Sequence, residues 1–181
     1  MSLAAAVFPD TTVLSSFAVV RRLELLEGWL RGRGRWVEAV AYEVNRGVAV
    51  VPGLAEVVAG GWLGDPIEIT DMGAQRAVEH LRRDVFGGRP VEPLKHLGEA
   101  QTCYLLRDDR RWQGCWWVSD DRDALRFARA QGLTTRETID VVAGSVADGD
   151  LTAGEAFALM QAMAEAGRAL RLPRAPADLT R

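Results

Sequence analysis

An apolar run at residues 114–118 leads directly into a group of carboxylates, and this junction constrains the fold more than any other feature of the chain. The run Gly-Cys-Trp-Trp-Val predicts a buried strand. Asp120, Asp121 and Asp123 follow it, where the sequence predicts the start of a helix. A strand that passes straight into a helix is typical of α/β proteins. The three acids make this junction a candidate functional site.

Two other carboxylates occupy similar positions. Asp10 follows a strand predicted over residues 3–8, and Glu99 opens a helix predicted over residues 99–107. The carboxyl ends of parallel strands carry the active sites of open α/β sheets, so we expect these acids to share one pocket. Clustered carboxylates repel one another unless a cation lies between them. The pattern therefore predicts a divalent metal ion and phosphate chemistry.

Strands and helices alternate along the chain. The predicted strands cover residues 3–8, 36–40, 66–70 and 114–118. The predicted helices cover about 13–20, 39–44, 54–59, 72–86, 99–107, 121–130, 135–147 and 153–170, and residues 23–29 could continue the first of them or form a second short helix. The strand at 3–8 is apolar on both faces and is expected to be central. This order predicts an α/β fold, a three-layer α/β/α sandwich with a central, mainly parallel sheet. We expect one domain over residues 1–172 and a loose tail over 173–181.

Composition excludes several classes of protein. No stretch approaches 18 uncharged apolar residues and the N-terminus has no basic region, so we expect no membrane association and a cytoplasmic location. Cys103 and Cys115 lack the spacing of a zinc site and are expected to be buried thiols. The two histidines, His80 and His96, are isolated, which argues against a histidine-based hydrolase.

The charge pattern leaves two explanations open. The net charge is −3, and Lys95 is the only lysine among 22 basic residues. Arginine is the better bidentate ligand for phosphate, so the arginine clusters fit a nucleic-acid partner. A preference for arginine can equally reflect the base composition of a genome.

Four motifs, in this order, resemble the PIN domain, the fold of the VapC-type toxins and related ribonucleases. They are Asp-Thr-Thr-Val-Leu at 10–14, Tyr-Glu-Val at 42–44, Leu-Gly-Glu-Ala at 97–100 and Val-Ser-Asp-Asp-Arg-Asp-Ala at 118–124. The resemblance covers about residues 3–170. It departs from the family pattern at Pro9, which precedes the first acid, and in the long segment from residue 46 to 90.

The resemblance implies a set of site residues. The catalytic acids would be Asp10, Glu43, Glu99 and Asp121; the Mg²⁺ or Mn²⁺ ligands would be Asp10, Glu99 and Asp121, with Asp120 and Asp123 as auxiliary candidates; and Thr11 or Thr12 would position the substrate. It also implies a metal-dependent ribonuclease that hydrolyses RNA, acts as the toxin of a toxin–antitoxin pair, binds an antitoxin protein and forms a homodimer.

Other interpretations of the same acids stay open at this point. Asp120, Asp121, Asp123 and Glu99 could each cap or stabilise the first turn of a helix, and Glu43 could be an ordinary exposed helix residue. The chain could also be a non-catalytic PIN-like module that binds nucleic acid or serves as a scaffold. A third hypothesis is a metal-dependent phosphohydrolase that acts on small molecules.

Overall fold

A computed structural model describes residues 5–180 of the chain. Residues 3 and 4 of the first predicted strand lie outside the described residues. The sheet contains β1 (Val7–Pro9), β2 (Trp116–Val118) and β3 (Thr134–Arg136), all parallel and in the order β1-β2-β3. The prediction of an α/β fold with a parallel sheet is confirmed. The first strand was expected to be central, but β2 is the middle strand of the sheet; on its other side, among the described residues, β1 pairs only through an isolated parallel bridge between Val7 and Gly34.

Burial explains why these short segments form strands. Val7, Phe8, Trp117 and Val118 are each at most 1% exposed, so successive side chains are buried on both faces of the sheet, as parallel sheets require. Pro9 stays in register opposite Val118. Two parallel strand ends, those of β1 and β2, therefore lie side by side immediately before Asp10 and Ser119.

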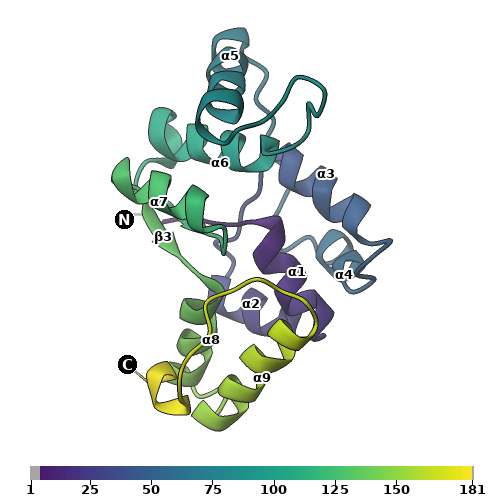
Figure 1. The fold of residues 1–181 in the computed structure, drawn as a ribbon, viewed down its shortest axis with the longest axis vertical. Helices are drawn as coiled ribbons and strands as arrows, with labels where there is room; N and C mark the ends of the chain where they lie inside the picture. Colours follow the sequence, from purple (N-terminus) through teal and green to yellow (C-terminus); the bar gives the residue numbers. More distant parts are fainter. Residues whose placement is uncertain (1–4, 181) are drawn as a thin grey trace.

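Helices surround this small sheet (Figure 1). The α-helices are α1 (Thr11–Val19), α2 (Leu23–Leu30), α3 (Glu38–Gly47), α4 (Leu54–Gly60), α5 (Met72–His80), α6 (Leu97–Asp108), α7 (Arg122–Ala130), α8 (Thr138–Ala147) and α9 (Ala153–Glu165). A π-helical turn, η1 (Leu81–Val85), continues α5, and 3-10 turns form η2 (Arg110–Trp112) and η3 (Pro176–Leu179). Helices α5 and α6 lie at one end of the molecule, and α8 and α9 lie at the other (Figure 1).

Several predicted elements differ from the structure. Residues 36–40 and 66–70 form no strands but only an isolated parallel bridge between Val37 and Ile67, and α3 already begins at Glu38. The helix predicted from residue 135 begins at Thr138, because residues 134–136 pair with β2 instead.

Two pairs of residues near the C-terminus have capping-box spacing, and only one of the pairs forms the box. Thr134 and Glu137 have the spacing of a capping box but do not form one, and a box between Glu137 and Asp140 opens α8 instead. Thr152 and Glu155 have the same spacing and do form a box, at the start of α9. That helix ends at Glu165, five residues before the predicted end.

The C-terminal segment, which we expected to be loose, is packed. Its turn η3 contacts α8 and α9, and Leu179 is only 1% exposed. Cys103 and Cys115 are buried free thiols, as predicted. Within residues 5–180, every helix is too short or too polar to span a membrane.

Candidate acidic site

Asp10 lies directly after β1 and is the N-cap residue of α1. Its Oδ1 accepts a hydrogen bond from the Thr11 backbone N–H at 2.8 Å. Its Oδ2 accepts from the hydroxyl groups of Thr12, at 3.1 Å, and Ser119, at 3.0 Å. The residue is 5% exposed. Both carboxylate oxygens are therefore held in place inside the protein, at the carboxyl end of the sheet.

Glu43 reaches the same place from α3. The hydroxyl of Thr11 donates to Glu43 Oε2 at 2.6 Å, while the backbone of Thr11 donates to Asp10. Thr11 thus connects two carboxylates that lie far apart in the sequence. The structure brings Asp10, Thr11, Thr12 and Glu43 together.

Glu99 lies in the first turn of α6, and its Oε1 is 3.3 Å from His96 Nδ1. The neighbouring Gly98 is buried against α3, and a Cβ atom there would lie 3.3 Å from Glu43 Oε1. The start of α6 therefore approaches Glu43 closely. His96, which the sequence left without a clear role, is the immediate partner of Glu99.

Asp121 is the N-cap residue of α7, and its Oδ1 accepts from the Ala124 N–H at 2.8 Å. Its own N–H donates to Ser119 Oγ at 3.1 Å. Since the same Ser119 hydroxyl donates to Asp10, it links these two acids. Asp121, Asp123 and Glu99 also line a common pocket of about 610 Å³.

The two auxiliary acids are placed differently. Asp120 points to the start of α8, where it accepts from the backbone N–H of Thr138 at 3.0 Å and from its hydroxyl at 2.6 Å. Burial raises the pKa of Asp120, and the bonds from Thr138 partly offset this. Asp123 has an 85% exposed side chain that pairs with Arg126. Neither residue shares a hydrogen bond with Asp10, Glu43 or Glu99.

Electrostatics couple the central acids. The pKa of Asp10 is raised to about 7, first by burial and then by the charges of Glu99 and Glu43, while the bonds from Ser119 and Thr11 act in the opposite direction. Burial also raises the pKa of Glu43, against the bond from Thr11; the charge of Glu99 raises it too, and the charge of His96 lowers it. The charge of Glu99 thus disfavours ionisation of both Asp10 and Glu43.

Oxygen donors of this kind suit Mg²⁺ or Mn²⁺, which prefer carboxylates. Among the described residues, however, no group of three or more His, Cys, Asp or Glu side chains lies together closely enough to hold a metal ion. Several carboxylate oxygens are engaged instead by Thr11, Ser119 and the start of α7. The donor chemistry fits a divalent cation, whereas the ligand set is not assembled in advance.

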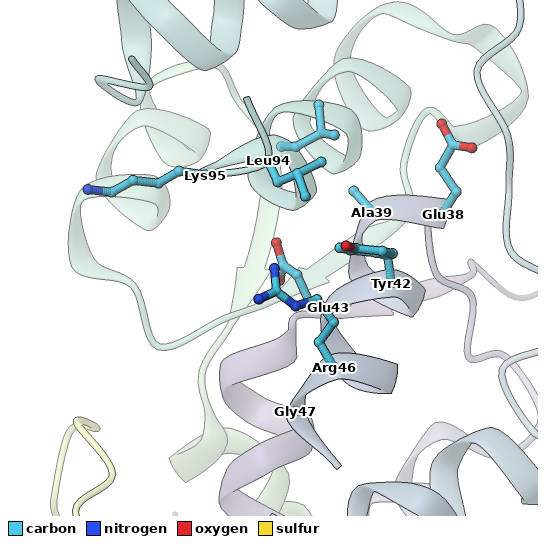
Figure 2. Close-up of a pocket in the computed structure, with 9 residues that line it drawn as sticks. Glu38, Ala39, Tyr42, Glu43, Arg46, Gly47, Leu94 and Lys95 are labelled. Carbon is cyan, nitrogen blue, oxygen red and sulfur yellow. The ribbon is translucent and has the colours of Figure 1, made fainter. Parts of the chain in front are cut away.

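A second pocket, of about 690 Å³, opens beside Glu43. Tyr42 and Arg46 of α3 lie on one side of it, and Leu94 and Lys95 lie on the other (Figure 2). The sequence analysis did not identify these residues or Ser119 as functional. The signal available in the sequence was the spacing of four residues between Tyr42 and Arg46, but that spacing alone does not show which face of a helix is open.

Comparison with protein-family models, curated proteins and solved structures gives no match for this chain. The likeness to PIN domains rests on the four sequence motifs alone. The function is therefore inferred from the residues of this chain and their geometry.

Proposed function

We propose that this protein is a metal-dependent ribonuclease whose acidic site hydrolyses phosphodiester bonds of RNA. Asp10, Glu99 and Asp121 would hold Mg²⁺ or Mn²⁺, and Glu43 would position the site. The observation that supports this most is the position of Asp10, a buried carboxylate whose pKa is raised to about 7 first by burial and then by two neighbouring acids. Carboxylates whose pKa is strongly shifted by burial and by neighbouring charges are typical of functional sites.

Helix capping alone does not explain this arrangement. A carboxylate that only caps a helix gains from the N–H groups and the helix dipole, and its pKa falls. The pKa of Asp10 rises instead, although it caps α1 and accepts hydrogen bonds from Thr11 and Ser119. Keeping such a group ionised at neutral pH costs free energy, and a bound cation removes that cost.

The metal ion would act on the phosphate and on water, and the side chains of the protein would hold the acids in position. A bound Mg²⁺ or Mn²⁺ neutralises charge on the phosphate and makes water easier to deprotonate. The hydroxyls of Thr11 and Ser119 keep Glu43 and Asp10 oriented toward the centre of the site. His96 orients Glu99. Thr12 contacts Asp10 from the same helix start.

The proposal extends to the finer fold and the biological role. The parallel sheet and its helices are compatible with the three-layer, PIN-like sandwich that the sequence motifs imply. A PIN-like ribonuclease of this kind would act as a toxin, with an antitoxin protein as its partner.

The test is cleavage of labelled single-stranded RNA by the purified chain with Mn²⁺, with Mg²⁺ and with EDTA. We expect Asp10→Asn and Asp121→Asn to lower the rate by about 100-fold or more, since both would be ligands. Asp65→Asn is the matched control, because Asp65 is an exposed acid outside the site. Parent-like cleavage by both Asp10→Asn and Asp121→Asn would show that the site is wrongly assigned.

Titration calorimetry with Mn²⁺ separates the nuclease from a non-catalytic PIN-like module. We expect the parent chain to bind Mn²⁺ and Asp10→Asn to lose most of that binding. A parent chain that binds RNA but neither Mn²⁺ nor Mg²⁺ would favour the non-catalytic module.

A further inference from the structure

The pocket beside Glu43 carries chemistry that the acidic site does not use. Glu38, Tyr42 and Arg46 line it and follow one another at intervals of four residues on α3. Residues spaced by four lie on one face of a helix, each about one turn from the last. The pocket wall therefore presents an acid, an aromatic ring and a guanidinium group in a fixed order along the helix.

Tyr42 is the unusual member of this row. It is 48% exposed, whereas the other apolar side chains of α3, Ala39, Val40, Ala41 and Val44, are buried. Its ring is not needed for the core. The Arg46 guanidinium carbon lies 5.8 Å from the centre of the ring, within the range of a cation–π contact. An exposed aromatic ring beside an arginine is typical of surfaces that stack nucleic-acid bases.

The opposite wall of the pocket is formed by Leu94 and Lys95. Leu94, which is 43% exposed, supplies an apolar contact, and Lys95 lies beside it with its ammonium group turned away from Tyr42 and 3.8 Å from Glu92 (Figure 2). Arg82 holds the loop that carries Leu94 and Lys95. Its side chain is 1% exposed and donates to the backbone oxygens of Glu92, at 3.1 Å, and Lys95, at 3.4 Å. The wall is therefore positioned by a buried contact.

Glu38, at the other end of this row from Arg46, carries a negative charge. Glu38 accepts a hydrogen bond from Gln101 Nε2 at 2.9 Å, and the buried Gln101 is itself fixed by the Ala39 N–H. A fixed carboxylate repels phosphate and accepts hydrogen bonds from the N–H groups of a base. Phosphate would therefore lie at the Arg46 end, and the base would extend along Tyr42 toward Glu38.

We propose that this pocket binds one nucleotide of single-stranded RNA next to the bond that is cleaved. The base stacks on Tyr42, and its phosphate contacts Arg46. The proposal rests on the proposed nuclease function, because Tyr42 and Glu43 are adjacent and the pocket opens beside the acidic site. The volume of about 690 Å³ is within the usual range of small-ligand sites. Only an unpaired base offers a free face for stacking.

The test measures binding separately from cleavage. Binding of a fluorescent single-stranded RNA is followed by anisotropy in the Asp10→Asn background, so the result does not depend on turnover. We expect Tyr42→Ala to weaken binding by about 5- to 100-fold, as loss of one stacking contact does, and Tyr42→Phe to bind within about twofold of its parent. The melting temperature of each variant confirms that it is folded.

A second variant tests the phosphate contact. Arg46→Gln should weaken binding and reduce the salt dependence by about one released counterion. Arg110→Gln, which removes an exposed arginine in η2 before β2, is the matched control and should change neither. Unchanged binding in both Tyr42→Ala and Arg46→Gln would overturn the nucleotide pocket, as would a background protein that binds no RNA.

The two proposals can fail separately. If Tyr42→Ala weakens RNA binding but the parent chain cleaves no RNA with either metal, the pocket stands as an RNA-binding site and the nuclease fails. If the parent cleaves RNA and Tyr42→Ala binds as its background does, the nuclease stands and the pocket fails. A pocket that serves a protein partner instead would give this second result.

Discussion

The Ser119 hydroxyl, at the end of β2, donates to Asp10 Oδ2, at the end of β1, across 3.0 Å. The same oxygen accepts the N–H of Asp121 at 3.1 Å. Ser119 is fully buried, so this one hydroxyl connects two neighbouring strand ends and two of the site acids without solvent. Its partners make it a positioning residue for the acidic site.

Replacing Ser119 with alanine tests this position. The change leaves a buried carboxylate with one donor fewer, and we expect the free energy of unfolding to fall by about 1–3 kcal/mol. Because the Ser119 bond lowers the pKa of Asp10, its loss should also weaken Mn²⁺ binding, by about 10- to 100-fold. Denaturant titration and calorimetry measure the two effects.

Ser145→Ala is the matched control for this variant. Ser145 is also buried, but its hydroxyl donates to the Val141 carbonyl within α8, away from the acids. It should change stability without changing Mn²⁺ affinity. Parent-like Mn²⁺ binding in Ser119→Ala would show that the hydroxyl does not position the ligands.

The raised pKa of Asp10 predicts how the stability of the metal-free protein depends on pH. The group titrates near 3.8 when unfolded and about 7 when folded, so between these values the folded state holds a proton that the unfolded state has lost. Stability therefore decreases as pH rises through this window, by about 4 kcal/mol for a shift of this size. About 2 kcal/mol of this change falls between pH 5.5 and pH 7, and denaturant titrations in EDTA at pH 5.5 and pH 8 measure that part.

Asp10→Asn removes the titrating group and isolates its contribution. At pH 8 in EDTA we expect this variant to be more stable than the parent, because a buried charge near two acids is gone. Between pH 5.5 and pH 8 it should lose less stability than the parent. Equal pH dependence in the two proteins would contradict the raised pKa of Asp10.

Addition of Mn²⁺ should make the parent protein more stable than Asp10→Asn. Mn²⁺ bound to the folded state alone raises the melting temperature of the parent as its concentration exceeds the dissociation constant. We expect a much smaller rise in Asp10→Asn, which lacks one ligand charge. Thermal melts with a series of Mn²⁺ concentrations test this, and equal shifts in the two proteins would place the metal elsewhere.

The sequence predicted those parts of the site that depend on local signals. Asp10 follows an apolar strand, and Asp121 has the spacing of an N-cap; both positions are as predicted. Strand β3 was missed because Thr134, Thr135 and Arg136 are polar and too few to form a pattern. They form a strand only because they pair with the free edge of β2.

The contacts that organise the acids are also non-local. Ser119 is separated from Asp10 by 109 positions, and Thr11 from Glu43 by 32. No periodicity in the sequence marks such pairs. The open face of Tyr42 depends in the same way on the loop around Leu94, which no signal within α3 can reveal.

Asp121 and Asp123 should differ sharply in RNA cleavage. Asp121 connects to Asp10 through Ser119, whereas Asp123 is exposed and pairs only with Arg126. Asparagine is also a good N-cap, so Asp121→Asn should keep α7 intact while it lowers cleavage by about 100-fold. Asp123→Asn removes a surface ion pair of little energetic value and should stay within about threefold of the parent. Cleavage assays and far-UV circular dichroism test both, and equal losses in the two variants would contradict this division.

Gly98 should be needed for the approach of α6 to α3. Alanine is the better helix former by about 1 kcal/mol, but a Cβ atom at this position would lie 3.0 Å from Val40 Cγ2 and 3.3 Å from Glu43 Oε1. Both side chains must then move, so we expect Gly98→Ala to gain no stability and to lose about tenfold in RNA cleavage, since small displacements of reacting groups are costly.

Gly28→Ala is the matched control, because that helical glycine has nothing within 4 Å of an added Cβ. It should gain about 0.5–1 kcal/mol and cleave RNA like the parent. Denaturant titration and cleavage rates decide the comparison, and an equal gain of stability in both variants with full activity would show that Glu43 tolerates the added methyl group.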